Sequence, residues 1–244
     1  MEVTKQRLGI ESGSKFIGKT FLYMFLALLL TAVVGVGLGL LFQYKFTSTF
    51  VDDGIKTQYA MVYIIAMVVS LIALLAIGIW FSISAYRGRH SLVVPFTLYA
   101  FFMGVLMSSF VLFVDIATLG LAFGITTIAF GSMAAIGLLS KRDLSFLGIV
   151  VMGLGIGALV LFLMNLIFYF VYPALYGPTY IIIESVIFII IMLVTIIDVY
   201  RMRKIAEHGE ANNNLALFCA FNLYIDFIQL FIRVVYILLI ARRR

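Results

Sequence analysis

The chain has 244 residues, of which 64% are hydrophobic and only 11% are charged, and its formal net charge is +6 at pH 7. A soluble domain carries about 25% charged residues, so this composition excludes the soluble classes and predicts an integral membrane protein. The single cysteine, Cys219, excludes an internal disulfide, and basic residues that lie between apolar segments argue against a nucleic-acid partner.

Seven apolar stretches are long enough to cross a bilayer, which takes about 20 residues per helix. They cover residues 20–43, 60–85, 92–114, 117–139, 145–172, 179–201 and 215–240. Residues 1–19 are predicted to form a short cytoplasmic segment. The predicted fold is all-α, a single transmembrane domain over residues 1–244 with seven transmembrane helices, the last of them central in the bundle.

Glycines and prolines predict where helices approach one another and where they begin. Two glycine triplets, in the first and fifth spans, are expected to allow close helix packing: Gly35, Gly37, Gly39, Gly153, Gly155 and Gly157. The segment SKRDLS, residues 140–145, reads as a charged turn that ends on Ser145 as the N-cap of the fifth span. The segment PALYGP, residues 173–178, reads as a compact turn with Pro178 at the start of the sixth span.

Lysine and arginine set the expected orientation. With the N-terminus inside, the inner segments carry eleven of these residues and the outer segments carry five, including the C-terminal Arg242–Arg244 tail. Because cytoplasmic loops are enriched in Lys and Arg, this count favours a cytoplasmic N-terminus.

Strongly polar residues in the last two spans share one face of each helix. At 100° per residue, those of the last span fall within about 60° of one another: Asn222, Asp226, Gln229 and Arg233. Those of the sixth span do the same: Glu184, Thr195 and Asp198. Since a helix face exposed to lipid cannot hide such groups, we expect these stripes to face protein or a water-filled pore.

Asp198 and Asp226 are predicted to meet in the inner half of the membrane, because the two spans are consecutive and antiparallel. Two carboxylates in a low dielectric share a proton, take up a cation or recruit an arginine. Hard oxygen ligands suit Ca²⁺ better than transition metals. This reasoning predicts a pH-sensitive cation gate. A purely structural role, in which the acids hydrogen-bond helices together, is the alternative.

Arg233 has two candidate partners. Glu184 lies about 21 Å from Asp198 along the sixth helix, toward the outer side, and an outward-pointing Arg233 would reach it. Pairing with Asp226 would instead neutralise the inner site. We prefer the outer ion pair between Glu184 and Arg233.

Three segments resemble the transmembrane Bax inhibitor motif family, also called the Bax inhibitor-one family. They are FGITTIAFGSMAAIGLLSKRDLSFLG (123–148), IIDVYRMRKIAEH (196–208) and ALFCAFNLYIDFIQLF (216–231). The resemblance implies a bacterial member with seven helices, the last surrounded by the others. It also implies a pH-sensitive calcium leak whose aspartate sensor corresponds to Asp198 and Asp226.

The resemblance further implies a basic residue at the end of the second span that pairs with the sensor in the closed state. Arg87 is the nearest candidate and Arg89 the second. The sequence departs from the family pattern in reading IDV around Asp198, where Y-D-T or Y-D-L is commoner, and Glu184 and Arg233 are additions.

Three functions follow from these residues. The first is a calcium leak channel of a bacterial plasma membrane, with calcium ions and protons as its ligands and no cofactor. The second is a proton- or cation-coupled transporter that uses Glu184 and Arg233 to bind a small solute. The third is a regulator that binds another membrane protein, such as a membrane protease. No motif for enzymatic catalysis accompanies the acids, and we do not expect an enzyme.

Overall fold

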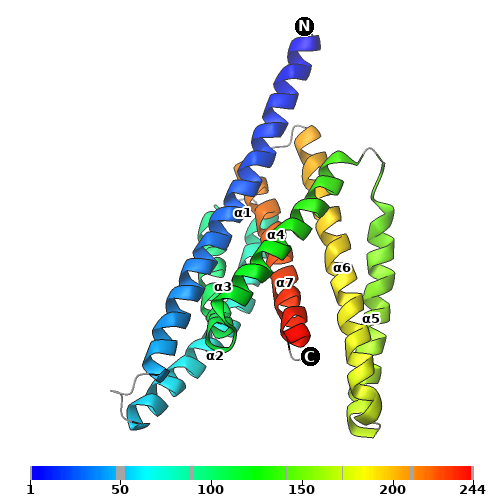
Figure 1. Ribbon diagram of the computed structural model, residues 1–244. Helices are drawn as coiled ribbons and strands as arrows, with labels where there is room; N and C mark the ends of the chain where they lie inside the picture. The colour runs from blue at the N-terminus through cyan, green and yellow to red at the C-terminus, as the bar shows by residue number, and fades with distance from the viewer. Residues whose placement is uncertain are drawn as a thin grey trace. The chain divides into compact units, whose positions relative to one another are not determined.

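The computed structural model is all-α over the residues that it describes (Figure 1). It describes the backbone of residues 2–47, 53–87, 91–140, 142–171, 173–208 and 212–242, and the side chains of all of these except 2–12, 45–47, 53–58, 87 and 173–178. The helices in chain order are α1 (Glu2–Thr47), α2 (Asp53–Arg87), α3 (Val93–Phe113), α4 (Ile116–Leu139), α5 (Phe146–Val171), α6 (Pro173–Glu207) and α7 (Asn213–Arg242).

All seven helices are long and apolar enough to cross a membrane, which confirms the predicted fold class. Of the most apolar 18-residue stretch of α7, 44% is buried, against 0–33% in the other six helices, while the central position of the last span stays a prediction. In α5, no residue of the most apolar 18-residue stretch is buried, and large apolar side chains such as Ile149 and Phe170 are exposed. A membrane would cover these side chains with lipid.

Three helices begin several residues before their predicted spans, including α2, which starts at Asp53 instead of near residue 60. Helix α1 starts at Glu2, well before the apolar run, because no proline interrupts residues 2–19. Helix α6 starts at Pro173, so the prediction that it begins at Pro178 is wrong. A proline suits the first position of a helix, and Pro173 takes that position.

The chain divides into two compact units. The first comprises residues 1–121 and 208–224, and the second comprises residues 122–207 and 225–244. The boundaries fall inside α4 and α7, so the two ends of each of these helices belong to different units. The single transmembrane domain stays a prediction.

The core of the first unit is a cluster of aromatic rings from α2, α3 and α7. The ring of Phe221 stacks on Phe81 with centroids 3.9 Å apart and meets Phe96 edge-on at 5.6 Å. One turn further along α7, the hydroxyl of Tyr224 lies 2.7 Å from the hydroxyl of Thr31 on α1. Tyr224 and Phe81 are fully buried, and aromatic pairs contribute about 0.5–1.5 kcal/mol each beyond the area that they bury.

Helix α1 packs closely along α3, where glycines remove the side chains between the two backbones. A Cβ at Gly39 would lie 2.5 Å from the Cβ of Val111, and one at Gly35 would lie 3.2 Å from the carbonyl oxygen of Gly104. The predicted close approach is therefore confirmed for Gly35 and Gly39. It is wrong for Gly37, which points away from this face, and for the α5 triplet, since a Cβ at any of these four positions meets no described atom within 4 Å.

Replacing Gly104 by alanine should destabilise the protein, because the new Cβ would lie 2.7 Å from the Cβ of Val34 and 2.9 Å from the carbonyl oxygen of Thr31. Overpacking of this kind costs about 1–3 kcal/mol. The matched control is Gly37→Ala, whose Cβ meets no atom of the described residues within 4 Å. Thermal unfolding of the purified protein should show a lower Tm for the first variant only. Equal values for both would contradict the close α1–α3 contact.

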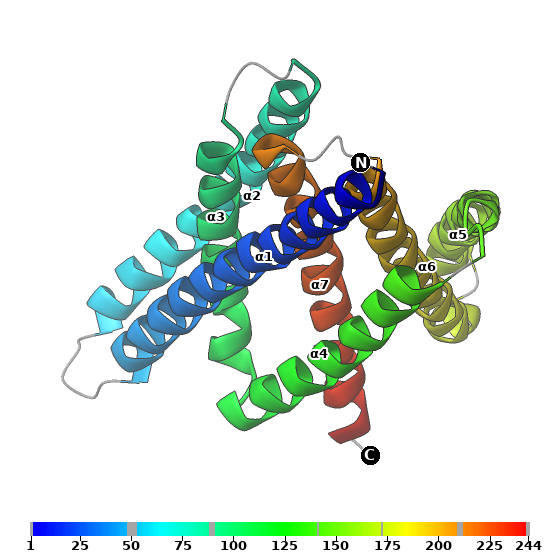
Figure 2. The same cartoon turned by 90° about the horizontal axis from the view of Figure 1, so that it is seen from above.

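In the second unit, α5 and α6 run side by side in both views (Figures 1 and 2). Helix α4 also packs against α6, and the contact is made at Gly137. A Cβ at Gly137 would lie 2.8 Å from the carbonyl oxygen of Ile196 and 2.9 Å from the Cβ of Val199. This contact therefore brings the α4 backbone against the turn of α6 that carries Asp198.

Candidate functional site

Asp226 is the only charged residue in the described part of the chain that is buried, with 6% of its surface exposed. The surroundings are apolar, because Leu223 and Leu230 of the same helix are fully buried and the ring of Phe227 packs against Phe130 with centroids 5.5 Å apart. The carboxyl oxygen Oδ2 of Asp226 has no hydrogen-bond partner among the described residues. A buried ionised carboxylate without a partner is costly, so this oxygen calls for a proton or a cation.

Asp198 lies on α6, and its charge acts on Asp226. The Asp198 side chain is 17% exposed and lies between the buried residues Ile197 and Val199. Its basic partner is Arg201, whose Nη1 lies 3.7 Å from Oδ1 of Asp198 and whose side chain is 69% exposed. Exposed pairs of this kind contribute about 0–1 kcal/mol, so Asp198 is only weakly neutralised. The two predicted acids thus lie within electrostatic reach of one another, and their role as a sensor stays a prediction.

Thr195, one turn before Asp198, completes this group. It is fully buried, and its hydroxyl donates a hydrogen bond of 2.9 Å to the carbonyl oxygen of Ile191 while also lying beside the Asp226 carboxyl group. With the hydroxyl proton directed at Ile191, the threonine oxygen can accept a hydrogen bond from a protonated Asp226. The arrangement therefore accommodates a proton on the acid.

The other two polar residues of the predicted stripe lie differently. Asn222 is half-buried, and Gln229 is exposed. At 100° per residue Gln229 lies 60° from Asp226 around α7, at the edge of the stripe, which accounts for its exposure. Its role as a pore-lining residue stays a prediction. The side chain of Arg87 and the whole of Arg89 lie outside the described residues, so the closed-state partner also stays a prediction.

Glu184 and Arg233 form an ion pair between α6 and α7, in which Nη1 of Arg233 contacts Oε2 of Glu184. Both side chains are largely covered, with 26% of the arginine and 19% of the glutamate side chain exposed. The rings of Tyr180 and Tyr236 meet one turn away, with centroids 6.2 Å apart. The structure therefore pairs Arg233 with Glu184, the partner that we preferred over Asp226.

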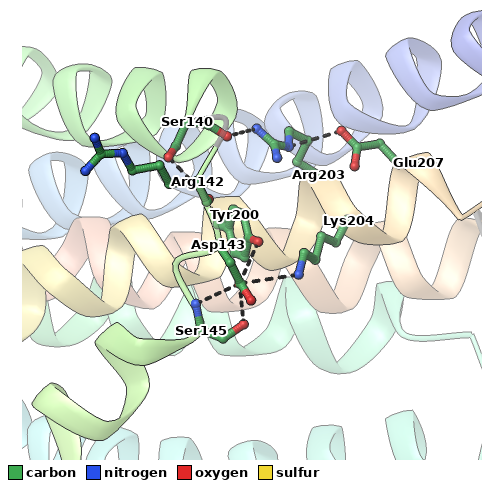
Figure 3. A network of polar contacts seen from close by, with 8 residues as sticks. All are labelled: Ser140, Arg142, Asp143, Ser145, Tyr200, Arg203, Lys204 and Glu207. Carbon is green, nitrogen blue, oxygen red and sulfur yellow. Dashed lines mark hydrogen bonds and ion pairs between the residues drawn. The ribbon is translucent and has the colours of Figure 1, made fainter.

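The turn between α4 and α5 carries a second polar cluster, centred on Asp143 (Figure 3). The Oδ1 atom of Asp143 accepts hydrogen bonds from the backbone N–H and the hydroxyl of Ser145, at 3.0 and 2.6 Å. It also accepts one from the hydroxyl of Tyr200 on α6 at 2.9 Å, and it lies 3.5 Å from Nζ of Lys204. The prediction that the Ser145 side chain caps α5 is wrong, because its hydroxyl donates to Asp143, and the Asp143 carboxylate accepts the N–H of Ser145 just before α5 begins.

Arg203 of α6 extends the same cluster to the end of α4. Its Nη1 donates to the carbonyl oxygens of Leu138 and Ser140, at 2.8 and 2.6 Å, and its Nε lies 3.1 Å from Oε1 of Glu207. The last carbonyls of a helix lack partners within the helix, and a cation there also interacts favourably with the helix dipole. We call Asp143, Ser145, Tyr200, Arg203 and Lys204 the turn network.

These contacts hold the pKa of Asp143 well below its usual value of 3.8, first through the hydroxyl and backbone N–H of Ser145, then through Tyr200 and the charge of Lys204. A lowered pKa in the folded state contributes stability that is present above the unfolded value and is lost as pH falls through the folded value. The Asp143 carboxylate therefore keeps its charge to a lower pH than an ordinary aspartate does. The sequence analysis missed the turn network, although the signal was present in the acid of SKRDLS and the basic residues of YRMRK.

Comparison with known proteins identifies the family to which the sequence is similar. Residues 13–243 match the family described as Inhibitor of apoptosis-promoting Bax1. An uncharacterized protein of Borreliella burgdorferi is 26% identical over 241 residues, which cover 95% of this chain and 94% of that protein. The match spans nearly the whole chain and confirms the resemblance found in the sequence. The chain belongs to the family of inhibitors of apoptosis-promoting Bax1.

Proposed function

We propose that the protein is a calcium leak channel in which protonation of Asp198 and Asp226 sets the flow of ions. The observation that supports this most strongly is the buried carboxyl group of Asp226, with one oxygen lacking a partner among the described residues and a second acid beside it. Intramembrane acids are expensive to keep and are functional by default. Protons and calcium would compete for the same oxygens.

The pair suits an ion that passes rather than one that stays. Two carboxylates supply at most four of the six to eight oxygens that calcium takes, so water and backbone carbonyls would complete the shell. Within the described ranges no three or more His, Cys, Asp and Glu side chains come together as a metal site. We propose Asp198 and Asp226 as a transient calcium site in a bacterial plasma membrane, with the N-terminus in the cytoplasm.

The test is calcium entry into liposomes that contain the reconstituted protein and a calcium-sensitive dye, measured over a series of pH values. The proposal predicts flux above that of empty liposomes, with a sigmoidal dependence on pH. Flux equal to that of empty liposomes at every pH would rule out a leak. Flux that exceeds it but ignores pH would rule out the proton gate.

A crevice beside Glu184 and Arg233 favours a second candidate, a coupled transporter of a small solute. The crevice has a volume of about 300 Å³, and Ser185, Phe188 and Tyr236 line it together with the ion pair. Its opposite charges suit a zwitterionic solute. Saturable uptake of such a solute, driven by a proton gradient in the same liposomes, would favour the transporter over the leak.

A further inference from the structure

Helix α6 is attached to α4 and to the α4–α5 turn on both sides of Asp198. Before and just after the acid, Ile196 and Val199 contact the α4 backbone at Gly137. Beyond it, Tyr200 and Lys204 bind Asp143. Asp198 therefore lies within a segment of α6 that contacts α4 or the α4–α5 turn on both sides.

The close contact at Gly137 leaves no room for movement of the α6 backbone toward α4. The nearest atoms to a Cβ at this position are a backbone oxygen and the Cβ and Cγ1 of Val199, which is fully buried. None of these atoms lies at the end of a flexible side chain, so a larger residue would displace the helix itself. This packing therefore sets where α6, and with it Asp198, lies relative to α4.

The turn network fixes the same segment by charge and hydrogen bonds. Tyr200, Arg203 and Lys204 are spaced so that they lie on neighbouring turns of one α6 face, and all three reach the α4–α5 turn. The ammonium group of Lys204 also lies 4.8 Å from the centroid of the Tyr200 ring. The network holds two helix ends, the last carbonyls of α4 and the first turn of α5, against α6.

We infer that Gly137 and the turn network are positioning residues for the acid pair, which hold Asp198 against Asp226 and so determine the pH at which the proposed channel responds. This inference rests on the proposed function. In the described part of the second unit, the charged groups that act on the acid pair are the two acids themselves and Arg201. The charged group that acts on Asp143 is Lys204, while Ser145 and Tyr200 act on it through hydrogen bonds.

The turn network does not itself sense pH in the range where the channel would respond. The pKa of Asp143 is held below its ordinary value by Ser145, Tyr200 and Lys204, so this carboxylate keeps its charge at pH values where an ordinary aspartate would already be protonated. Its removal should therefore move the pH response without abolishing it. Loss of a sensor acid should abolish the response, so the two roles can be separated.

The experiment compares the pH midpoint of calcium flux in liposomes for Gly137→Ala, Asp143→Asn and Tyr200→Phe. Each should shift the midpoint by about 0.5–1 pH unit, because a small change in the separation of coupled charges alters proton affinity by that order. Tyr200→Phe removes only the hydroxyl, so it still tests the inference if Gly137→Ala or Asp143→Asn fails to fold. The controls are Gly131→Ala on α4, whose Cβ meets no described atom within 4 Å, and Asp115→Asn, an exposed acid at the start of that helix.

A second measurement does not depend on flux. Spin labels at Ile189 of α6 and Ile237 of α7, both exposed, report the distance between these helices in a Cys219→Ser background. Gly137→Ala and Asp143→Asn should shift or broaden the distance distribution, and Gly131→Ala should not. Unchanged distances would overturn the positioning role whether or not the protein conducts calcium. Unshifted midpoints in a channel whose pH response is abolished by Asp226→Asn would overturn it while leaving the proposed function standing.

Discussion

Replacing Asp226 by asparagine should flatten the pH dependence of calcium flux. Asparagine keeps the size of the side chain but cannot ionise. It therefore removes the titrating group, and with it one negative charge, from the pair. A single titrating group changes the population of its charged form by up to about tenfold per pH unit, and we expect the variant to vary by less than about twofold over the same range. Only the loss of the other sensor acid, Asp198, should have as large an effect on the response.

The measurement is the liposome flux assay, run at matched protein density for the wild type and the variant. Asp115→Asn is the matched control, because it makes the same chemical change at an exposed acid whose carboxylate accepts hydrogen bonds from Thr118 at the start of α4. Asparagine caps a helix about as well as aspartate, so the control should behave like the wild type. A pH response that survives in Asp226→Asn would contradict the sensor role of Asp226.

Replacing Arg233 by methionine should destabilise the protein by about 1–3 kcal/mol, the cost of leaving a largely covered charge without its partner. The methionine retains the length of the arginine stem but leaves Glu184, which is 19% exposed, unpaired next to apolar neighbours such as Ile183. Thermal unfolding in a single detergent is the measurement. A Tm equal to that of the wild type would contradict a stabilising ion pair.

Two double variants separate the ion pair from simple packing. Exchanging the charges, Glu184→Arg with Arg233→Glu, should recover most of the lost stability because the pair is restored with opposite polarity. Removing both charges, Glu184→Gln with Arg233→Met, should also be better tolerated than the single change, since no unpaired charge remains. If the single variant and both double variants are equally unstable, the loss comes from side-chain shape.

Regular patterns made part of this site predictable from the sequence. Asp198 and Asp226 were assigned to one another because consecutive spans are antiparallel and a fixed rise per residue places both acids near the same depth. The same calculation placed Glu184 within reach of Arg233. Helical geometry is insensitive to the surrounding residues, which is why these predictions needed no tertiary information.

Features that depend on tertiary contacts were not predictable in this way. The hydrogen bond from Tyr200 to Asp143 joins residues 57 positions apart, and nothing in the spacing of SKRDLS specifies its partner. The glycines show the same limit, because Gly35, Gly37 and Gly39 look alike in sequence and only the packing of α3 distinguishes them. The start of α6 at Pro173 rather than Pro178 depended on a choice between two prolines with equal local preference.

A double-mutant cycle on the pH response tests most directly whether the two acids act as one unit. The flux of Asp198→Asn, of Asp226→Asn and of the double variant is measured against pH under identical conditions. If a proton is shared between adjacent carboxyl groups, the double variant should be no more impaired than the more impaired single variant. Independent effects that add in the double variant would contradict a coupled pair.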